Sequence, residues 1–347
     1  MRSYSYNGQK LRPVVEIYHD VVPYLGGITE KEFYLDTDKC IAAWRLANEQ
    51  IKACFGDLFP PRTPSAPPLS YGHLACLGAE LTYTENGEPN VKPCADDIDA
   101  AIAFMEKNKD LDFATAPECR RYVEMNAALQ KAFPEETILP LAGFGVQGVI
   151  TTAVLLRGQD FFYDVYDEPE KVLQLLDLIS DSIIAFKKFQ NRTNGAPEIT
   201  ATSTGIADDF ASLLPPAMWP EFVVPYWKKQ FSALGTESAR HFLHCENVSP
   251  AQLKYFKDAG VTYYQPSVSD ALTLQNVKEN IDIPFDWLLY AYRITEMTDK
   301  EIEAWVDAAV LAGVTKIRTQ FGKYAWSEGK LDRIRAFCRA FDKYSVT

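Results

Sequence analysis

The strongest constraint on the fold is a regular alternation of short apolar runs with helical patterns along the chain. The runs have the length and the β-branched or apolar character of buried strands. Eight of them are predicted as strands: Pro13–Tyr18, Leu81–Thr84, Thr137–Ala142, Ile199–Thr202, Arg240–His244, Val261–Tyr264, Phe285–Leu289 and Val314–Thr319. Strands that alternate with helices indicate an α/β protein built on parallel pairing.

The segments between these strands carry helix signals. Apolar residues recur at spacings of three and four between Glu168 and Arg192, which predicts an amphipathic helix. Ser249–Gln252 is a capping box with Pro at the first helical position, and Gly260 ends the helix that it opens. A second capping box, Thr298–Glu301, opens a helix that ends at Gly313.

The whole chain, residues 1–347, is predicted to be a single (β/α)₈ TIM barrel, because eight strand–helix units suit its length. A doubly wound open sheet is the rival. Gly143–Gly148 lacks the glycine spacing of a dinucleotide-binding turn, which counts against that rival. The Pro-rich stretch at residues 60–68 is predicted as an extended surface loop. In a barrel, the active site lies at the carboxyl ends of the strands.

Composition narrows the choice of partners. The net charge is −12, from 35 Lys+Arg against 47 Asp+Glu, so the chain repels nucleic-acid phosphates. Seven Cys without paired spacing indicate free thiols in a reducing compartment. The sequence shows neither a signal peptide nor a membrane-spanning segment, so we expect a cytoplasmic protein that binds no membrane. The oligomeric state is left open.

The densest group of chemically active residues follows the strand Arg240–His244. Alternation along a strand places His244 and Glu246 on one face and Cys245 on the other. An imidazole and a carboxylate on one face can bind Zn²⁺ or act as an acid–base pair. If the strand ends at His244, alternation fails and Cys245 becomes the better metal ligand. The alternative is that His244 only makes hydrogen bonds and Cys245 is a small buried residue.

Two further groups lie at predicted strand ends. Asp208 and Asp209 follow the strand Ile199–Thr202, where paired carboxylates can share a proton, bind substrate or ligate a metal. A helix cap with a solvated neighbour is the competing interpretation. His19 closes the first strand and is a third candidate for catalysis.

Several segments resemble the uroporphyrinogen decarboxylase superfamily, in the family's order. They are Leu77–Glu80, Gly145–Thr152, Leu156–Phe161, Tyr166–Leu176, Ala207–Asp209 and Pro215–Tyr226. The resemblance covers most of the chain and implies a single barrel. True uroporphyrinogen decarboxylases carry arginines in an N-terminal segment, and the corresponding Glu16–Pro23 has none. The resemblance therefore points to the branch of zinc-dependent methyltransferases that work with corrinoid proteins.

That branch carries His-x-Cys at the strand that corresponds to Arg240–His244, and a distal Cys. Here Glu246 stands in place of the thiolate, and the last strand offers Gln320 instead of Cys. The resemblance thus implies transfer of a methyl group from a small donor, such as a methoxylated aromatic, to a corrinoid carried by a partner protein. Zinc would be held by His244, Glu246, Cys245 and Gln320.

Aromatic residues near the strand ends suit a flat apolar donor, and we expect Tyr18, Tyr264, Trp287 and Tyr290 to contact it. The competing interpretation is that these rings pack the barrel. Two other functions remain open at this point. One is a metal-independent decarboxylase of a small acid, and the other is a barrel that binds a corrinoid or tetrapyrrole without turnover.

Overall fold

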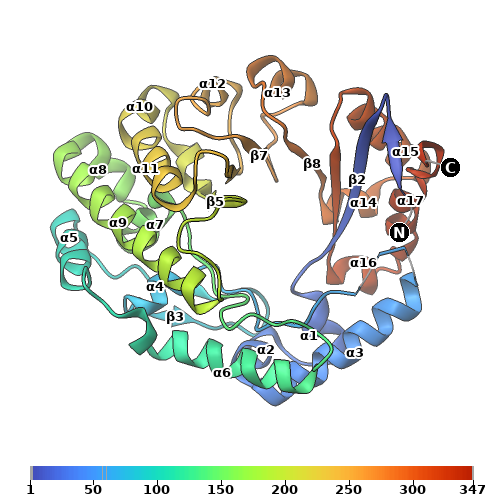
Figure 1. Ribbon diagram of the computed structural model, residues 1–347, viewed down its shortest axis with the longest axis horizontal. Coiled ribbons are helices and arrows are strands. Elements are labelled where there is room, and N and C mark those ends of the chain that lie inside the picture. The colour runs from blue at the N-terminus through green and yellow to red at the C-terminus, as the bar shows by residue number, and fades with distance from the viewer. Residues whose placement is uncertain (1–2, 57, 60, 346–347) are drawn as a thin grey trace.

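The computed structural model describes residues 3–56, 58–59 and 61–345, which fold as an α/β protein. The strands are β1 Tyr4–Tyr6, β2 Gln9–Ile17, β3 Leu81–Thr82, β4 Asn90–Val91, β5 Ser203–Ala207, β6 Arg240–His244, β7 Tyr263–Gln265, β8 Asp286–Leu289 and β9 Lys316–Phe321. Figure 1 shows β2, β5, β7 and β8 around the middle of the molecule, with helices outside them.

The helices before residue 200 are α1 Val21–Gly26, α2 Glu30–Leu35, α3 Thr37–Phe55, α4 Gly72–Cys76, α5 Ile98–Lys107, α6 Pro117–Ala132, α7 Val149–Arg157, α8 Phe161–Asp167 and α9 Pro169–Thr193. Those after it are α10 Trp219–Phe222, α11 Val224–Leu234, α12 Pro250–Leu253, α13 Leu274–Asn280, α14 Ala291–Glu296, α15 Asp299–Leu311, α16 Lys323–Ser327 and α17 Leu331–Arg339. Both predicted capping boxes are present, at α12 and α15.

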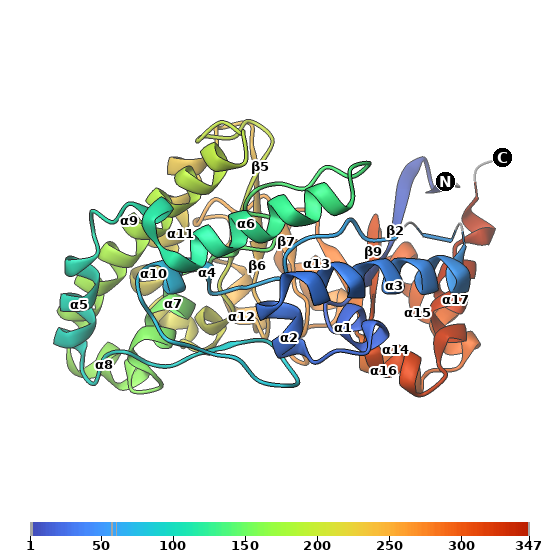
Figure 2. The ribbon, with the colours of Figure 1, turned by 90° about the horizontal axis from the view of Figure 1, so that it is seen from below.

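The parallel strands follow one another in chain order. One ladder joins β5, β6 and β7, and another joins β8, β9 and β2. A single bridge between Tyr264 and Phe285 links the two ladders. Because β9 pairs with β2, strands from opposite ends of the chain are neighbours, which a doubly wound sheet does not predict. Figure 2 shows the same elements from below, with α3 and α6 on the face turned toward the viewer.

Three predicted strands differ in the structure. The strand predicted at Ile199–Thr202 forms later, as β5 Ser203–Ala207, and within the predicted range Thr200 makes an isolated bridge to Gly235. Thr137–Ala142 forms turns, and only Phe144 makes a parallel bridge, to Leu69. The reason is that a side chain, and not a neighbouring strand, forms hydrogen bonds with the backbone carbonyls of this segment. The Asn126 amide donates to the carbonyls of Pro140 and Ala142 at 3.1 and 2.9 Å. Leu81–Thr84 contributes only the two-residue β3, paired antiparallel with β4.

The Pro-rich stretch is extended but packed, which corrects its assignment to the surface. Pro60 lies outside the described residues, whereas Pro64, Ala66 and Pro67 are buried. Side chains from the flanking helices donate to its carbonyls: Trp44 Nε1 to Ser65 at 2.9 Å and the Tyr122 hydroxyl to Pro67 at 2.9 Å. Within the described residues, no helix combines the length and the apolar character needed to cross a bilayer.

Gly143 lets this stretch pack closely, and we expect Gly143→Ala to destabilise the fold. Its φ is +79°, and a Cβ atom would lie 2.3 Å from the carbonyl oxygen of Ala66. The expected loss is about 2–3 kcal/mol in urea unfolding. Gly313→Ala is the matched control, because φ is +84° there and the Cβ would meet nothing within 4 Å. Equal losses in both variants would show that backbone strain alone matters.

Candidate active site

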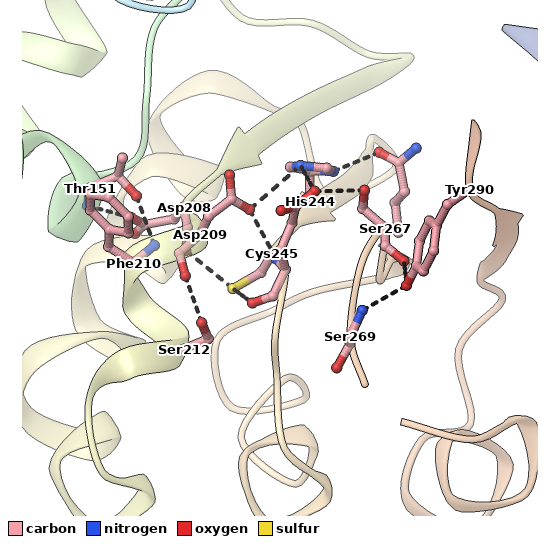
Figure 3. Close-up of polar contacts among 12 residues, drawn as sticks. Thr151, Asp208, Asp209, Phe210, Ser212, His244, Cys245, Ser267, Ser269 and Tyr290 are labelled. Carbon is pink, nitrogen blue, oxygen red and sulfur yellow. Dashed lines mark hydrogen bonds and ion pairs between the residues drawn. The ribbon is translucent and has the colours of Figure 1, made fainter. Parts of the chain in front are cut away.

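The site is built where β5 and β6 end side by side. Register pairs Ala207 with His244, so the residues that follow each strand meet at one edge. The His244 Nε2 atom lies 3.5 Å from Asp209 Oδ1 and 4.0 Å from Glu246 Oε1. The Glu246 backbone N–H donates to Asp209 Oδ1 at 2.9 Å, which ties the two loops together. Figure 3 shows Asp209 directed toward the His244 ring. This group is the Asp209–His244–Glu246 cluster.

The predicted alternation at the end of β6 holds, since His244 and Glu246 face the same cluster while Cys245 faces away. The Cys245 side chain is buried, and its thiol donates to the carbonyl oxygen of Asp208 at 3.1 Å. Burial raises the pKa of the thiol well above its usual value, so it stays protonated. The position of Cys245 therefore contradicts the expectation that it shares a metal with His244.

Glu246 is held from the loop after β7. Ser267 Oγ donates to Glu246 Oε1 at 2.7 Å. The Tyr290 hydroxyl in turn donates to the Ser267 carbonyl and accepts from the Ser269 N–H, both at 2.8 Å. Tyr290 was expected to contact substrate, whereas its hydroxyl here braces the loop (Figure 3). Ser267 lies at a strand end, where polar residues face the site in a barrel, and the structure places it against Glu246.

Asp208 is buried, unlike its neighbour. Its side chain has 0% exposure and accepts from the Thr151 N–H at 2.7 Å and from Trp227 Nε1 at 2.8 Å. Burial raises the pKa of this carboxyl to about 6, although its N–H donors act in the opposite direction. The structure thus places only Asp209 of the predicted pair against His244, and Asp208 holds the start of α7.

Gly148 explains how Asp208 fits so closely against the start of α7. A Cβ atom at Gly148 would lie 2.3 Å from the Cβ of Asp208, so no larger residue fits there. In the sequence, Gly148 belongs both to the stretch that lacks nucleotide-binding spacing and to the family-like segment Gly145–Thr152. Its role is to let a buried carboxylate reach the backbone N–H groups of the first helical turn.

His19 lies in a second, acidic group at the end of β2. Its Nδ1 is 3.3 Å from Glu88 Oε1 and its Nε2 is 3.7 Å from Glu30 Oε2. Burial lowers the pKa of His19 to about 4, with Glu30 acting in the opposite direction, so the ring is neutral at pH 7. Tyr18 is 42% exposed beside it. Burial, Glu88, Asp20 and Glu246 together raise the pKa of Tyr18 to about 12.

The remaining predicted residues are dispersed. Tyr264 is fully buried, and its hydroxyl donates to the Cys245 carbonyl, so it does not line the site. Trp287 packs edge-on against Phe285. Gln320 lies on β9 opposite Glu16 of β2. Across the part of the chain that the structure describes, no three His, Cys, Asp or Glu side chains converge closely enough to hold a metal ion.

Polar side chains that gather at the carboxyl ends of parallel strands are typical of α/β enzymes. A model of the uroporphyrinogen decarboxylase (URO-D) family matches residues 71–283, which is more than half of the chain. The protein therefore belongs to the uroporphyrinogen decarboxylase family, as its sequence segments indicate. The matched region contains Asp209, His244 and Glu246.

Among solved structures, the fold is similar to that of a methyltransferase from Methanosarcina mazei. The two chains share 17% identity at a TM-score of 0.66, over 96% of this chain and 94% of the other. At this identity the likeness concerns the fold. A comparison with curated proteins finds no match.

Proposed function

We propose that this protein is a methyltransferase that moves a methyl group from a small donor to a corrinoid carried by a partner protein. The observation that carries the proposal is the Asp209–His244–Glu246 cluster, in which two carboxylates face one imidazole nitrogen at the end of β6. Family membership and the similarity to a solved methyltransferase support it. The fold would be a (β/α)₈ barrel in which two strands are reduced to the Leu69–Phe144 bridge.

The residues of the cluster supply acid assistance. A corrinoid, when bound in its reduced form, supplies the acceptor for the methyl group. As the bond between the methyl carbon and the leaving oxygen breaks, its electron pair stays on the oxygen, which then needs a proton. His244 Nε2 would donate that proton, and Asp209 and Glu246 would stabilise the positive charge that a protonated ring carries. Asp209 and His244 thus have separate tasks.

The chain's donors, as arranged, do not fit zinc. The Cys245 thiol is directed at the Asp208 carbonyl, so the four ligands implied by the resemblance are not together. Metal analysis of the purified protein tests the zinc prediction separately.

The surroundings of the cluster favour a donor without carboxylates. Glu30, Glu88 and Asp20 lie around His19 at the end of β2. Lys323 and Arg62 offset part of their charge, and the remaining excess of carboxylates adds to the charges of Asp209 and Glu246. A substrate with many carboxylates would be repelled there, which disfavours the reaction after which the family is named. Tyr18 offers an exposed aromatic face to a flat donor.

An assay with free reduced cobalamin tests the function. Purified protein is mixed with cob(I)alamin and one methyl donor at a time, from methoxylated aromatics and methylated amines. Formation of methylcobalamin, followed by its absorption spectrum, is the expected result with at least one donor class. Spectra that never change with any donor, while a small acid loses carbon dioxide, would favour the decarboxylase instead.

A further inference from the structure

A cavity of about 160 Å³ lies at the amino end of β5, away from the candidate active site. Lys187 and Asn191 line it from α9, Thr204 from β5, and Leu234 from the end of α11. The Asp209–His244–Glu246 cluster follows the other end of β5, so the two sites are separate. This second site is the Lys187 cavity.

Lys187 gives the cavity a positive group without a negative partner. Among the described residues that line the cavity, Lys187 alone carries a charge. Its ammonium donates to the carbonyl oxygen of Gly205 and, within the part of the chain that the structure describes, forms no ion pair with a carboxylate. An ammonium has three N–H donors, so at least two remain available to a ligand.

The missing negative partner has a measurable consequence for Lys187. Burial lowers the pKa of its ammonium from an ordinary value of 10.5 to about 8, and no charged neighbour acts on it. Keeping a positive charge away from water costs free energy unless an anion or further acceptors compensate it. An anion in the cavity would supply that compensation and would raise the pKa again.

The other residues of the cavity define the kind of anion. Thr204 is 7% exposed, and its hydroxyl forms no hydrogen bond with another residue that the structure describes. The Asn191 amide donates one N–H to the Glu198 carbonyl at 3.1 Å and keeps a second one. The remaining wall includes apolar side chains, from Ala196, Pro197 and Leu234. A single cation beside apolar side chains suits a monoanion with a short apolar tail, whereas a phosphate dianion would bring a charge without a partner.

We propose that the Lys187 cavity binds a small monocarboxylate, a short-chain aliphatic acid whose carboxylate accepts from Lys187 and Thr204. Its volume equals the share of about five water molecules in the liquid, which limits the ligand to a few heavy atoms. The apolar tail would contact Leu234. The inference does not rest on the proposed function, because the site shares no residue with the cluster that carries it.

NMR of the full chain labelled with ¹³C-lysine, titrated with sodium propionate, tests the inference. The Cε signal of Lys187 follows its pKa, which saturating propionate is expected to raise from about 8 toward 10.5. Sodium chloride at the same ionic strength should leave it unchanged. Because the charged ammonium binds the anion, the dissociation constant of propionate should rise about tenfold from pH 7 to pH 9.

Two variants separate the cavity from general salt effects. In Lys187→Met, propionate should no longer shift the backbone amide signal of Thr204. Lys188→Met is the matched control, because Lys188 is the next residue of α9 and does not line the cavity, and it should bind like the wild type. If Lys187→Met does not fold, Thr204→Val replaces it and should weaken binding about three- to tenfold.

Three results would overturn the inference. One is a pKa of Lys187 that stays the same in a large excess of propionate. Another is binding that persists unchanged in folded Lys187→Met or, where that variant does not fold, in Thr204→Val. The third is tighter binding of inorganic phosphate than of propionate, which would contradict the assignment to a monocarboxylate.

Discussion

His244→Ala is expected to lower kcat for methyl transfer by about 10²–10⁴-fold, the range that a positioned general acid contributes. The variant keeps both carboxylates but removes the only imidazole among them, so the leaving oxygen must depart without a proton from the protein. KM for the donor should change much less, because the ring acts on the leaving atom during bond cleavage. Steady-state rates of methylcobalamin formation measure both constants.

His241→Ala is the matched control, because His241 lies on the same strand as His244. Its ring stacks on Phe231 with centroids 4.7 Å apart, and its Nδ1 lies 2.8 Å from the Gly260 carbonyl oxygen. The control should lose stability while kcat of the folded enzyme stays within about threefold, a difference of less than 1 kcal/mol in barrier height. Equal losses of kcat in the two variants would contradict a specific role for His244.

Asp208→Ala is expected to destabilise the fold by about 3–5 kcal/mol, the cost of removing one partner from a buried charged network. The truncation leaves the Thr151 N–H and Trp227 Nε1 without their acceptor in the protein interior. Asp208→Asn keeps the shape of the side chain and should lose less. Urea unfolding at pH 7 gives both values, and a loss below about 1 kcal/mol in Asp208→Ala would show that the contacts matter little.

The same carboxyl gives the stability a pH dependence. Burial raises its pKa from an ordinary value of 3.8 to about 6 in the folded protein. The folded state thus holds this proton more tightly, and the group's favourable contribution is complete below about pH 4 and is lost as the pH rises through 6. The decrease is about 3 kcal/mol. Unfolding of the wild type relative to Asp208→Asn, measured from pH 4 to 7, should show this trend, and the opposite slope would contradict it.

Local patterns predicted part of the site well. Alternation along Arg240–His244 predicted His244 and Glu246 on one face. Both face the cluster although β6 ends at His244, because hydrogen bonds to Asp209 and Ser267 hold Glu246 there. The strand-end position of Gln265 and Ser267 indicates that they face the site, but their specific contacts with His244 and Glu246 were not predictable from local patterns. Gln265 and Ser267 approach through the register of β7 against β6, which depends on packing far from either residue in sequence.

Other features were missed because side chains took the place of sheet partners. Asn126 donates to two carbonyls within Thr137–Ala142, so an apolar run with strand character forms turns. The Pro-rich stretch is buried because hydroxyl and indole groups such as those of Tyr122 and Trp44 satisfy its carbonyls. A composition rich in Pro indicates an extended backbone, and it does not tell whether helices cover it.

The most direct test of the central claim follows the fate of labelled carbon in a single reaction. Donors with a ¹³C-methyl group and small acids with a ¹³C-carboxyl group are offered together with cob(I)alamin, and the products are followed by ¹³C NMR. The account predicts that label moves from a methyl donor to cobalamin in the wild type, and that His244→Ala slows this transfer. Label released as carbon dioxide, with none reaching cobalamin, would contradict it.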